Sequence, residues 1–332
     1  MRIVTFGEIM LRLSPTGYER LFQSDRLTGS FGGAEANVAI SLANFGEDAA
    51  FVTRLPDQAV GHGAVRTLRS FGVDTAGICF GGDRMGLYYQ EKGVGVRDSL
   101  CIYDRAHSAI AEASPSDFDW DSLLSGADWF HFTGITPALS PVLADICRTA
   151  CLTARRLGVR VSCDLNYREK LWPLSAARPV MAGLCSLVDV CIANEGEVRD
   201  LFDIRPEGTG QAYYEAMARE ACARFGFSQV ALTLFDPLSA SEDTWSGLLY
   251  DGQAVAFAPT YRLPLIDRVG IGDSFGAGLI YALCHRYGRQ EAIDFAVAAS
   301  CLKHTIEGDY NRVTTKEVET LMSGNGSGRV SR

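Results

Sequence analysis

The chain has 332 residues, 47% hydrophobic and 21% charged, which is ordinary for a soluble globular protein built around one large domain. Its net charge of −9 argues against nucleic acid as a main partner, because binding a phosphate backbone needs a basic surface. No apolar run reaches the ~18 residues of a membrane helix, and the opening run, MRIVTFGEIM, is too short for a signal peptide. We therefore expect a cytoplasmic protein without a membrane partner.

The ten cysteines are scattered along the chain, and no two of them form a C-x-x-C pair. A zinc site would need paired Cys/His spacing, so we expect reduced thiols packed in the core instead. The cysteines that lie inside apolar runs are Cys147, Cys163, Cys191, Cys284 and Cys301.

The first hundred residues change character part of the way along. Apolar and β-branched patterns predict a strand at 2–13, a helix within 31–46 that follows a glycine pair, a strand at 49–55 and a helix at 61–73. The next stretch is short, aromatic, alternating and punctuated by turns, which predicts antiparallel hairpins. We expect a small antiparallel β lid, contributed by residues of about 10–30 and 75–105.

From residue 127 onward, strand-like and helix-like runs alternate. This alternation predicts an α/β fold whose central sheet is mostly parallel and is covered by helices on both faces. We expect one domain over 1–322 and a mobile Gly/Ser-rich tail at 323–332, with ligands at the carboxyl ends of the strands. The predicted strands are 127–134, 159–166, 187–194 and 229–235, and the predicted helices are 141–158, 210–226, 274–287 and 290–304.

The stretch DRVGIGDSFGAG (267–278) carries the most chemistry. It is not a Walker A loop, which needs a Gly-Lys pair, nor a G-x-G-x-x-G fingerprint, because Phe275 stands where the third glycine belongs. Glycines at a helix start let main-chain amides bind developing negative charge, and Asp273 can accept a proton from a hydroxyl. That combination suits phosphoryl transfer to an alcohol, although Asp273 as a simple helix N-cap is an equal alternative.

This stretch resembles the C-terminal signature of the ribokinase-like (PfkB-type) carbohydrate kinases, D-T-x-G-A-G-D-x-F-x-x-G. GGAEANVA (32–39) resembles the N-terminal glycine motif of that family, and NEGE (194–197) resembles its N-x-x-E motif. The order of the motifs and the length agree over roughly 1–322. Within the family, YDR (103–105) and DLNYREKLW (164–172) are similar to the 2-keto-3-deoxygluconate kinases.

The resemblance implies an ATP- and Mg²⁺-dependent sugar kinase, with a monovalent cation as an option. The aromatic face of the lid separately suggests a homodimer formed through the lid. The resemblance also implies that Asp273 is the catalytic base and that the amides of Gly270, Ile271 and Gly272 form an anion hole that also contacts the nucleotide. Asn194 would contact the nucleotide and, with Glu197, hold magnesium through water. The implied contacts to the sugar are Gly33, Tyr89, Tyr103, Arg105, Asn166 and Arg168.

The arginines have a chemical reason to be there. A 2-keto-3-deoxy sugar acid carries a carboxylate, and a guanidinium group binds carboxylates in a planar, two-bond geometry. Arg105 in the lid and Arg168 after a sheet strand could face one pocket. Each of these residues also has a simpler explanation. Arg105 can be an exposed cation, and Arg168 can be part of an ion pair or a phosphate contact. Asn194 and Glu197 can be a helix cap, Tyr89 and Tyr103 can pack within the lid, and His131 can be a core residue.

Two departures from the family pattern concern the nucleotide. Ile271 is bulkier than the small residue usual between the signature glycines, and LFDPLSASEDTW (234–245) replaces a stretch that is often rich in Lys and Gly. We place the adenine pocket only loosely, along 235–245 and 296–308. A fructokinase or another sugar or nucleoside kinase is the alternative of the same class, and a non-catalytic sensor on the same fold is the alternative of another class.

Overall fold

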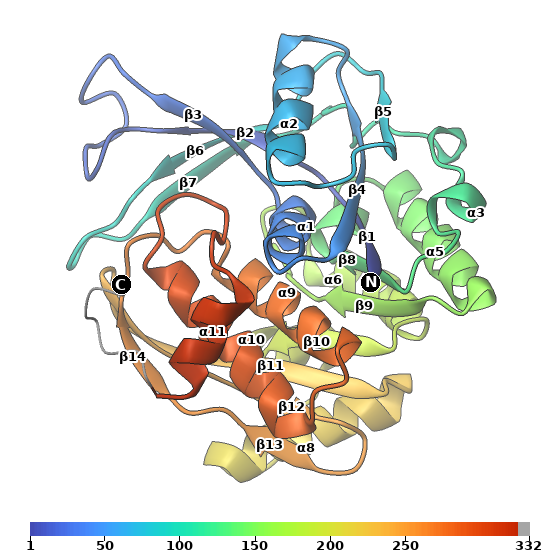
Figure 1. The fold of residues 1–332 in the computed structure, drawn as a ribbon, viewed down its shortest axis with the longest axis vertical. Coiled ribbons are helices and arrows are strands. Elements are labelled where there is room, and N and C mark those ends of the chain that lie inside the picture. Colours follow the sequence, from blue (N-terminus) through green and yellow to red (C-terminus); the bar gives the residue numbers. More distant parts are fainter. Residues whose placement is uncertain (325–332) are drawn as a thin grey trace.

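The computed structural model describes residues 1–324 and contains one large and one small sheet (Figure 1). The strands of the large sheet are β1 (Arg2–Phe6), β4 (Asp48–Leu55), β5 (Ile78–Phe80), β8 (Trp129–Thr133), β9 (Arg160–Asp164), β10 (Val190–Asn194), β11 (Gln229–Ser239), β12 (Glu242–Tyr250), β13 (Val255–Phe257) and β14 (Tyr261–Pro264). Their order is β13-β12-β11-β10-β9-β8-β1-β4-β5, with β14 also paired to β12. All pairings from β11 to β5 are parallel, and those of β12 are antiparallel.

Helices cover both faces of the large sheet, as predicted (Figure 1). One face packs against α1 (Ala34–Asn44), α2 (Ala59–Ser70), α9 (Ile271–Cys284), α10 (Arg289–His304) and α11 (Thr315–Met322). The other packs against α3 (Trp120–Leu123), α5 (Pro141–Leu157), α6 (Leu174–Cys185), α7 (Glu195–Phe202) and α8 (Gly210–Phe225). Successive residues of a strand belong to opposite cores, because side chains alternate across a sheet. In β10, Val190 and Ile192 contribute to the first core, and Cys191 and Ala193 to the second.

The helices begin and end at residues suited to those positions. The side chain of Ser140 caps α5 by accepting from the Leu143 amide at 3.2 Å, and Gly158 ends the helix in the left-handed conformation. Helix α9 begins at Ile271, three residues before the predicted start. The glycine stretch of the sequence is therefore the N-terminus and first turn of α9 itself.

The small sheet forms the lid, which projects from one side of the body (Figure 1). Its strands, in spatial order, are β3 (Thr28–Gly32), β2 (Met10–Ser14), β6 (Leu87–Glu91) and β7 (Leu100–Asp104). The outer pairings are antiparallel, as predicted, but the central pairing of β2 with β6 is parallel.

Two predicted elements are wrong in detail. Residues 2–13 are not one strand, because the chain leaves the large sheet after Phe6 and enters the lid at Met10. Strand β5, which the sequence analysis assigned to the lid, pairs with β4 in the large sheet. Most of the predicted tail, residues 325–332, lies outside the described residues.

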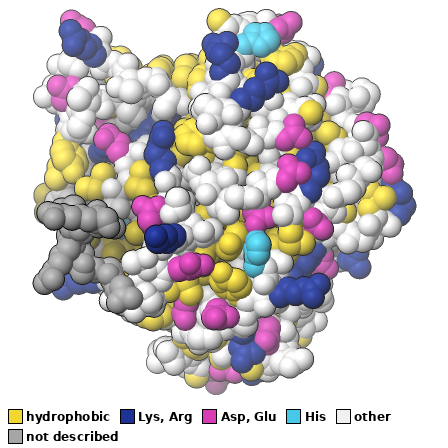
Figure 2. All heavy atoms as spheres, in the orientation of Figure 1, with side chains coloured by type: hydrophobic (Ala, Val, Ile, Leu, Met, Phe, Trp, Pro, Cys, Tyr) yellow, Lys and Arg dark blue, Asp and Glu magenta, His cyan; other side chains and the backbone are white. Residues whose placement is uncertain are grey.

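Other sequence expectations concern buried groups. His131 is fully buried in β8, where its Nδ1 lies 2.8 Å from Ser162 Oγ, and burial lowers its pKa to about 3. All ten cysteines are free thiols, and seven are buried. Within residues 1–324, no helix combines the length and apolarity needed to cross a bilayer. Acidic and basic side chains are interspersed over the face that carries α10 and α11 (Figure 2).

Candidate active site

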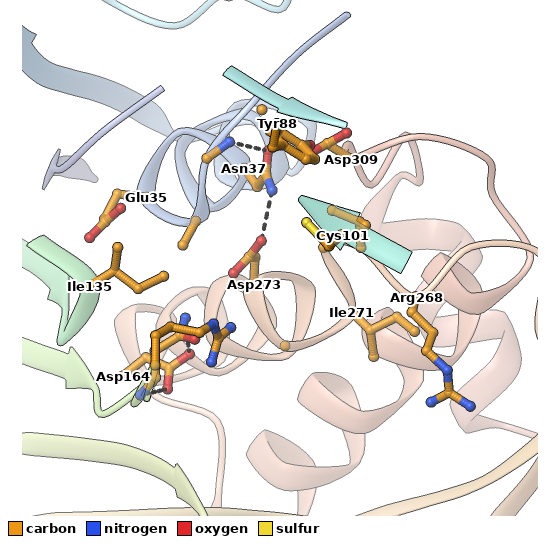
Figure 3. Close-up of a pocket in the computed structure, with 18 of the residues that line it drawn as sticks. Glu35, Asn37, Tyr88, Cys101, Ile135, Asp164, Arg268, Ile271, Asp273 and Asp309 are labelled. Atoms are coloured by element: carbon orange, nitrogen blue, oxygen red, sulfur yellow. Dashed lines mark hydrogen bonds between the residues drawn. The ribbon is translucent and has the colours of Figure 1, made fainter. Parts of the chain in front are cut away.

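A cleft of about 420 Å³ lies at the carboxyl ends of β9, β10 and β11, between the lid and the body. The N-termini of α1 and α9 open into it from the body, and β2, β6 and β7 contribute side chains from the lid. Figure 3 shows Asp273 near its centre, with Asn37 on one side and Asp164 on the other. Ligands of open α/β sheets bind at this edge, so the cleft is the candidate active site.

The first turn of α9 supplies main-chain amides to the cleft. Its N-cap, Gly270, has a φ of 81°, and a Cβ there would lie 2.0 Å from the carbonyl oxygen of Asp309, so the backbone requires glycine. Gly270, Ile271 and Gly272 all line the cleft. Because Gly270 is the N-cap, Asp273 is free of the capping role that was its alternative explanation.

Asp273 is held by a residue that sequence analysis missed. Asn37, 2% exposed on α1, donates its Nδ2 to Asp273 Oδ2 at 2.7 Å (Figure 3). Burial raises the pKa of Asp273 to about 6. The hydrogen bond from Asn37 and the positive charge of Arg168 act in the opposite direction and lower this pKa. A carboxylate with a pKa near neutrality suits a general base. Asn37 belongs to the GGAEANVA motif, where its polar amide inside an apolar helix was the available signal.

Gly33 lies where that motif enters α1. It is the N-cap of the helix, and a Cβ there would lie 1.9 Å from the carbonyl oxygen of Glu8, so a larger residue would displace the β1–β2 connection. Gly33 lines the cleft, as do Asn37 and Glu35 of the same helix. The motif thus brings a helix N-terminus and an amide side chain to the cleft together.

A second group of carboxyls faces Asp273 from the strand ends. Burial raises the pKa of Asp164, at the end of β9, and the charges of Glu197 and Asp273 raise it further. Burial also raises the pKa of Glu197. Carboxyls that share a site in this way favour a bound cation or proton between them.

Asn194 and Glu197 form a capping box at the start of α7. The Glu197 amide donates to Asn194 Oδ1 at 3.0 Å, and the Asn194 amide donates to Glu197 Oε2 at 2.9 Å. Glu197 Oε1 accepts from the Tyr167 amide at 3.1 Å, so both carboxylate oxygens already bind backbone amides. Across residues 1–324, no group of three or more His, Cys, Asp or Glu side chains could by itself hold a metal ion. Asn194 and Glu197 therefore have the helix-capping role that was their alternative explanation.

The lid strands turn alternate side chains toward the cleft. Tyr88 and Tyr103 line it, whereas Tyr89, a predicted sugar contact, does not. Tyr88 rather than Tyr89 faces the cleft, because neighbouring side chains in β6 point to opposite faces. Tyr88 is 4% exposed and donates its hydroxyl to Asp309, which lies across the cleft on the body.

Arg105 is not the exposed cation that was its alternative explanation. It is 8% exposed, and its Nε donates to Glu8 Oε2 at 2.8 Å, with Nη2 on the same oxygen. Ser108 donates to Glu8 Oε1 at 2.6 Å. Glu8 is only 2% exposed, so the pair is an internal ion pair at the edge of the cleft, and Arg105 is fixed in place.

The cleft contains two further arginines. Arg168 is exposed and donates Nη1 to the Tyr167 carbonyl at 3.0 Å, while the neighbouring Asn166 is buried with a φ of 38°. Arg268 donates both Nη atoms to the buried Asp243, at 2.7 and 3.0 Å. Among the described residues, the basic side chains that line the cleft are Arg105, Arg168 and Arg268.

The predicted adenine region is only half at the cleft. Phe235 and Trp245 line it, with stacked rings 5.8 Å apart, and Asp243 lies beside them. No described residue of 296–308 lines the cleft, although the His304 ring meets the Trp245 ring edge-on at 5.1 Å.

The cleft brings together eleven of the twelve predicted site residues. The residues that line it are Gly33, Tyr103, Arg105, Asn166, Arg168, Asn194, Glu197, Gly270, Ile271, Gly272 and Asp273. Tyr89 alone is displaced. The lining residues that sequence analysis did not assign include Glu8, Asn37, Tyr88, Asp164, Arg268 and Asp309.

Several known proteins resemble this chain over nearly its whole length. The model of the pfkB family carbohydrate kinases matches residues 1–316. A crystal structure of 2-dehydro-3-deoxygluconokinase from Thermotoga maritima is 47% identical, with a TM-score of 0.96 and 98% of each chain covered. The 2-dehydro-3-deoxygalactonokinase of Haloferax volcanii is 33% identical over 98% of each chain, and Fructokinase-1 of Oryza sativa subsp. japonica is 29% identical over 96% of each. With the signature glycines, the capping box and Asp273 meeting in one cleft, the chain belongs to the pfkB family of carbohydrate kinases, which are phosphotransferases that act on an alcohol group.

Proposed function

We propose that this kinase transfers the γ-phosphoryl group of ATP to a primary hydroxyl of 2-keto-3-deoxygluconate or of a near relative such as its galacto epimer. One observation carries the proposal: the Asp273 carboxylate is held by Asn37 beside the amides at the N-terminus of α9, inside the cleft. A general base and an anion-binding helix terminus are the two groups that this reaction needs.

In the proposed step, the acceptor oxygen bonds to the γ-phosphorus while the bond from that phosphorus to the β–γ bridging oxygen breaks, and ADP leaves. The hydroxyl proton passes to Asp273. The amides of Gly270, Ile271 and Gly272 donate to the charge on the transferring group. Asn194 and Glu197 would hold magnesium through water, and magnesium would neutralise part of the phosphate charge.

The arginines support an acidic acceptor. Arg168 reaches the cleft, and within residues 1–324 its guanidinium makes only a main-chain hydrogen bond, so its remaining N–H groups can bind a carboxylate. Arg105 is fixed by Glu8 and presents an oriented donor rather than a free charge. The relatives named for 2-dehydro-3-deoxy sugar acids are consistent with this assignment.

The test is a panel of acceptors assayed with ATP, with the mass of each product measured. The panel holds both 2-keto-3-deoxy acid epimers, fructose, ribose and adenosine. We expect the sugar acids to give a singly phosphorylated product with the highest kcat/KM. A preference for fructose would show that the protein is a fructokinase instead. Nucleotide binding without any phosphorylated product would favour a non-catalytic sensor.

The lid also supports a homodimer. Leu100 and Ile102, on β7, are 40% and 47% exposed, although apolar side chains in a sheet are usually covered. We propose that a second copy of the chain covers this face. Light scattering should give a dimer that Ile102→Glu converts to a monomer. The ten free thiols fit a reducing, cytoplasmic environment.

A further inference from the structure

Lys303 is a fully buried lysine with no role in the chemistry above. It lies on α10 with 0% exposure, and its Nζ donates to the carbonyl oxygen of Ile306 at 2.8 Å. Among residues 1–324, no carboxylate lies within ion-pair distance of its ammonium group. Lysines are almost never fully buried without a paired charge, so this position demands an explanation.

The position of Lys303 in the fold supplies an explanation for its burial. A Cβ built on Gly270 would lie 3.3 Å from Lys303 Cε, so the lysine stem packs against the N-cap of α9 from behind. The nearby charges are those of Asp267, Asp309, Arg12 and Asp273. Lys303 is thus next to the N-cap of α9, whose first turn lines the cleft, but does not line the cleft itself.

The surroundings of Lys303 are rigid. Arg12, on lid strand β2, donates Nη2 to Asp267 at 2.8 Å and Nη1 to Asp309 at 2.9 Å. Asp267 in turn accepts from the amides of Val269, at 3.2 Å, and Gly308, at 3.0 Å. The main chain just before Gly270, and the segment at Gly308 and Asp309 that packs against it, are thus fixed to the buried cluster of Arg12, Asp267 and Asp309.

We propose that Lys303 is a positioning residue whose buried ammonium adds a fixed positive charge behind the N-terminus of α9, where the terminal phosphate of the donor would bind. The inference rests on the proposed role of residues 270–273. Burial lowers the pKa of Lys303 to about 8, so the group still carries its charge at neutral pH.

A purely structural role predicts something different. The two carboxylates and Arg12 leave one negative charge, which Lys303 would simply balance. In that case, removing the lysine would destabilise the fold and affect ATP and ADP binding alike. If the ammonium acts on the terminal phosphate, ATP binding suffers more than ADP binding, because ADP lacks that phosphate.

The experiment is calorimetric titration of Lys303→Met with ATP and with ADP, next to wild type and to Lys92→Met. Lys92 is a matched control, because it pairs with Glu307 away from the cleft. We expect Lys303→Met to weaken ATP binding about 10- to 100-fold, as for a unit charge about 6–12 Å away at an effective dielectric of about 20, and ADP binding less than about twofold. Equal loss for both nucleotides would overturn the proposal.

A second variant separates an effect of Lys303 on turnover from an effect on stability. In Lys303→Met/Asp267→Asn, one buried carboxylate is neutralised together with the lysine, so we expect the melting temperature to recover. Turnover should stay about 100-fold below wild type, the typical effect of losing one stabilising group at an anion hole, with acceptor KM little changed. Recovery of turnover along with stability would show that Lys303 only balances charge. Failure of the wild type on the acceptor panel would instead refute the proposed function, while the ATP/ADP comparison would still test Lys303.

Discussion

The side-chain amide of Asn37 donates to Asp273 Oδ2 at 2.7 Å and thereby joins helix α1 to helix α9 across the cleft. Within residues 1–324 no protein group donates to Asp273 Oδ1, and the bond to Oδ2 restricts the orientation of the carboxylate. A base needs a fixed direction as well as a suitable pKa, because it must meet a hydroxyl within hydrogen-bond reach. The two glycine motifs of the sequence therefore meet in one cleft.

The first prediction concerns Asp273→Asn. The substitution keeps the shape and the hydrogen bond from Asn37 but removes the proton acceptor. We expect kcat to fall by at least about 10³-fold, within the range for loss of a general base, with acceptor binding retained in calorimetry. Asp294→Asn, on α10 and outside the cleft, is the matched control. Near-normal turnover of Asp273→Asn would show that Asp273 is not the general base.

The second prediction concerns pH. Asp273 must be ionised to accept a proton, so kcat should decline as the pH falls below about 6, the pKa that burial gives the group. The groups acting on it are Asn37, Arg168, Asp309 and Lys303. Asn37→Ala removes a donor to the ionised form, so the acidic limb of the kcat profile should move up by about one pH unit.

The control for this pH shift is Asn44→Ala. Asn44 lies on the same helix but donates to the Asn311 carbonyl, away from the cleft. Its profile should coincide with that of wild type. If Asn37→Ala lowers kcat equally at all pH values, the asparagine orients the carboxylate without affecting its ionisation.

The third prediction concerns stability. The folded pKa of Asp273, about 6, is above its ordinary value of 3.8, so ionisation opposes folding. This cost is absent below pH 4, grows as the pH rises from about 4 to 6, and then stays constant. Asp273→Asn should therefore unfold at a higher urea concentration than wild type at pH 8, with a gain of up to about 3 kcal/mol in the free energy of unfolding, and should show no gain at pH 4. A variant that is less stable at pH 8 would contradict this account.

Sequence reasoning located the parts of the site that lie within single motifs. Asp273 follows its glycines, and Asn194 and Glu197 form a capping box three residues apart, so local spacing sufficed. The order of strands and helices predicted the parallel sheet, and hence the edge at which these motifs meet.

The missed features depend on contacts between distant segments. Arg12 and Asp309 are 297 positions apart, and nothing in either neighbourhood signals the pairing. Tyr88 and Tyr89 are chemically identical, and only the pairing of Tyr88 with Arg12 and Tyr103 decides which one faces the cleft. The break after Phe6 was hidden for the same reason, since residues 2–13 remain apolar while passing from one sheet to the other.

The fourth prediction separates two effects of Arg105. Arg105→Met leaves the buried Glu8 carboxylate without its ion-pair partner, so we expect a loss of about 3–5 kcal/mol in stability. Glu8→Gln/Arg105→Met should recover most of that loss. If Arg105 also binds the acceptor carboxylate, KM for the sugar acid should stay raised in the double variant while KM for a neutral sugar changes little. Equal changes in both KM values would show that Arg105 only supports the lid.

The last prediction assigns Arg268 to the phosphate donor. Its guanidinium lies on the side of the cleft that Phe235 and Trp245 also line, clamped by Asp243 at 2.7 and 3.0 Å and by the Ser239 carbonyl at 3.1 Å. The chain lacks a lysine in 234–245, so Arg268 is the basic side chain next to those aromatic rings that can oppose the phosphate charge. Arg268→Met should raise KM for ATP about tenfold or more and leave acceptor KM unchanged, since a hydrogen bond to a charged group contributes about 1.5–3 kcal/mol. Arg262→Met, whose arginine pairs with Glu242 outside the cleft, is the control. A change confined to acceptor KM would place the donor phosphates elsewhere.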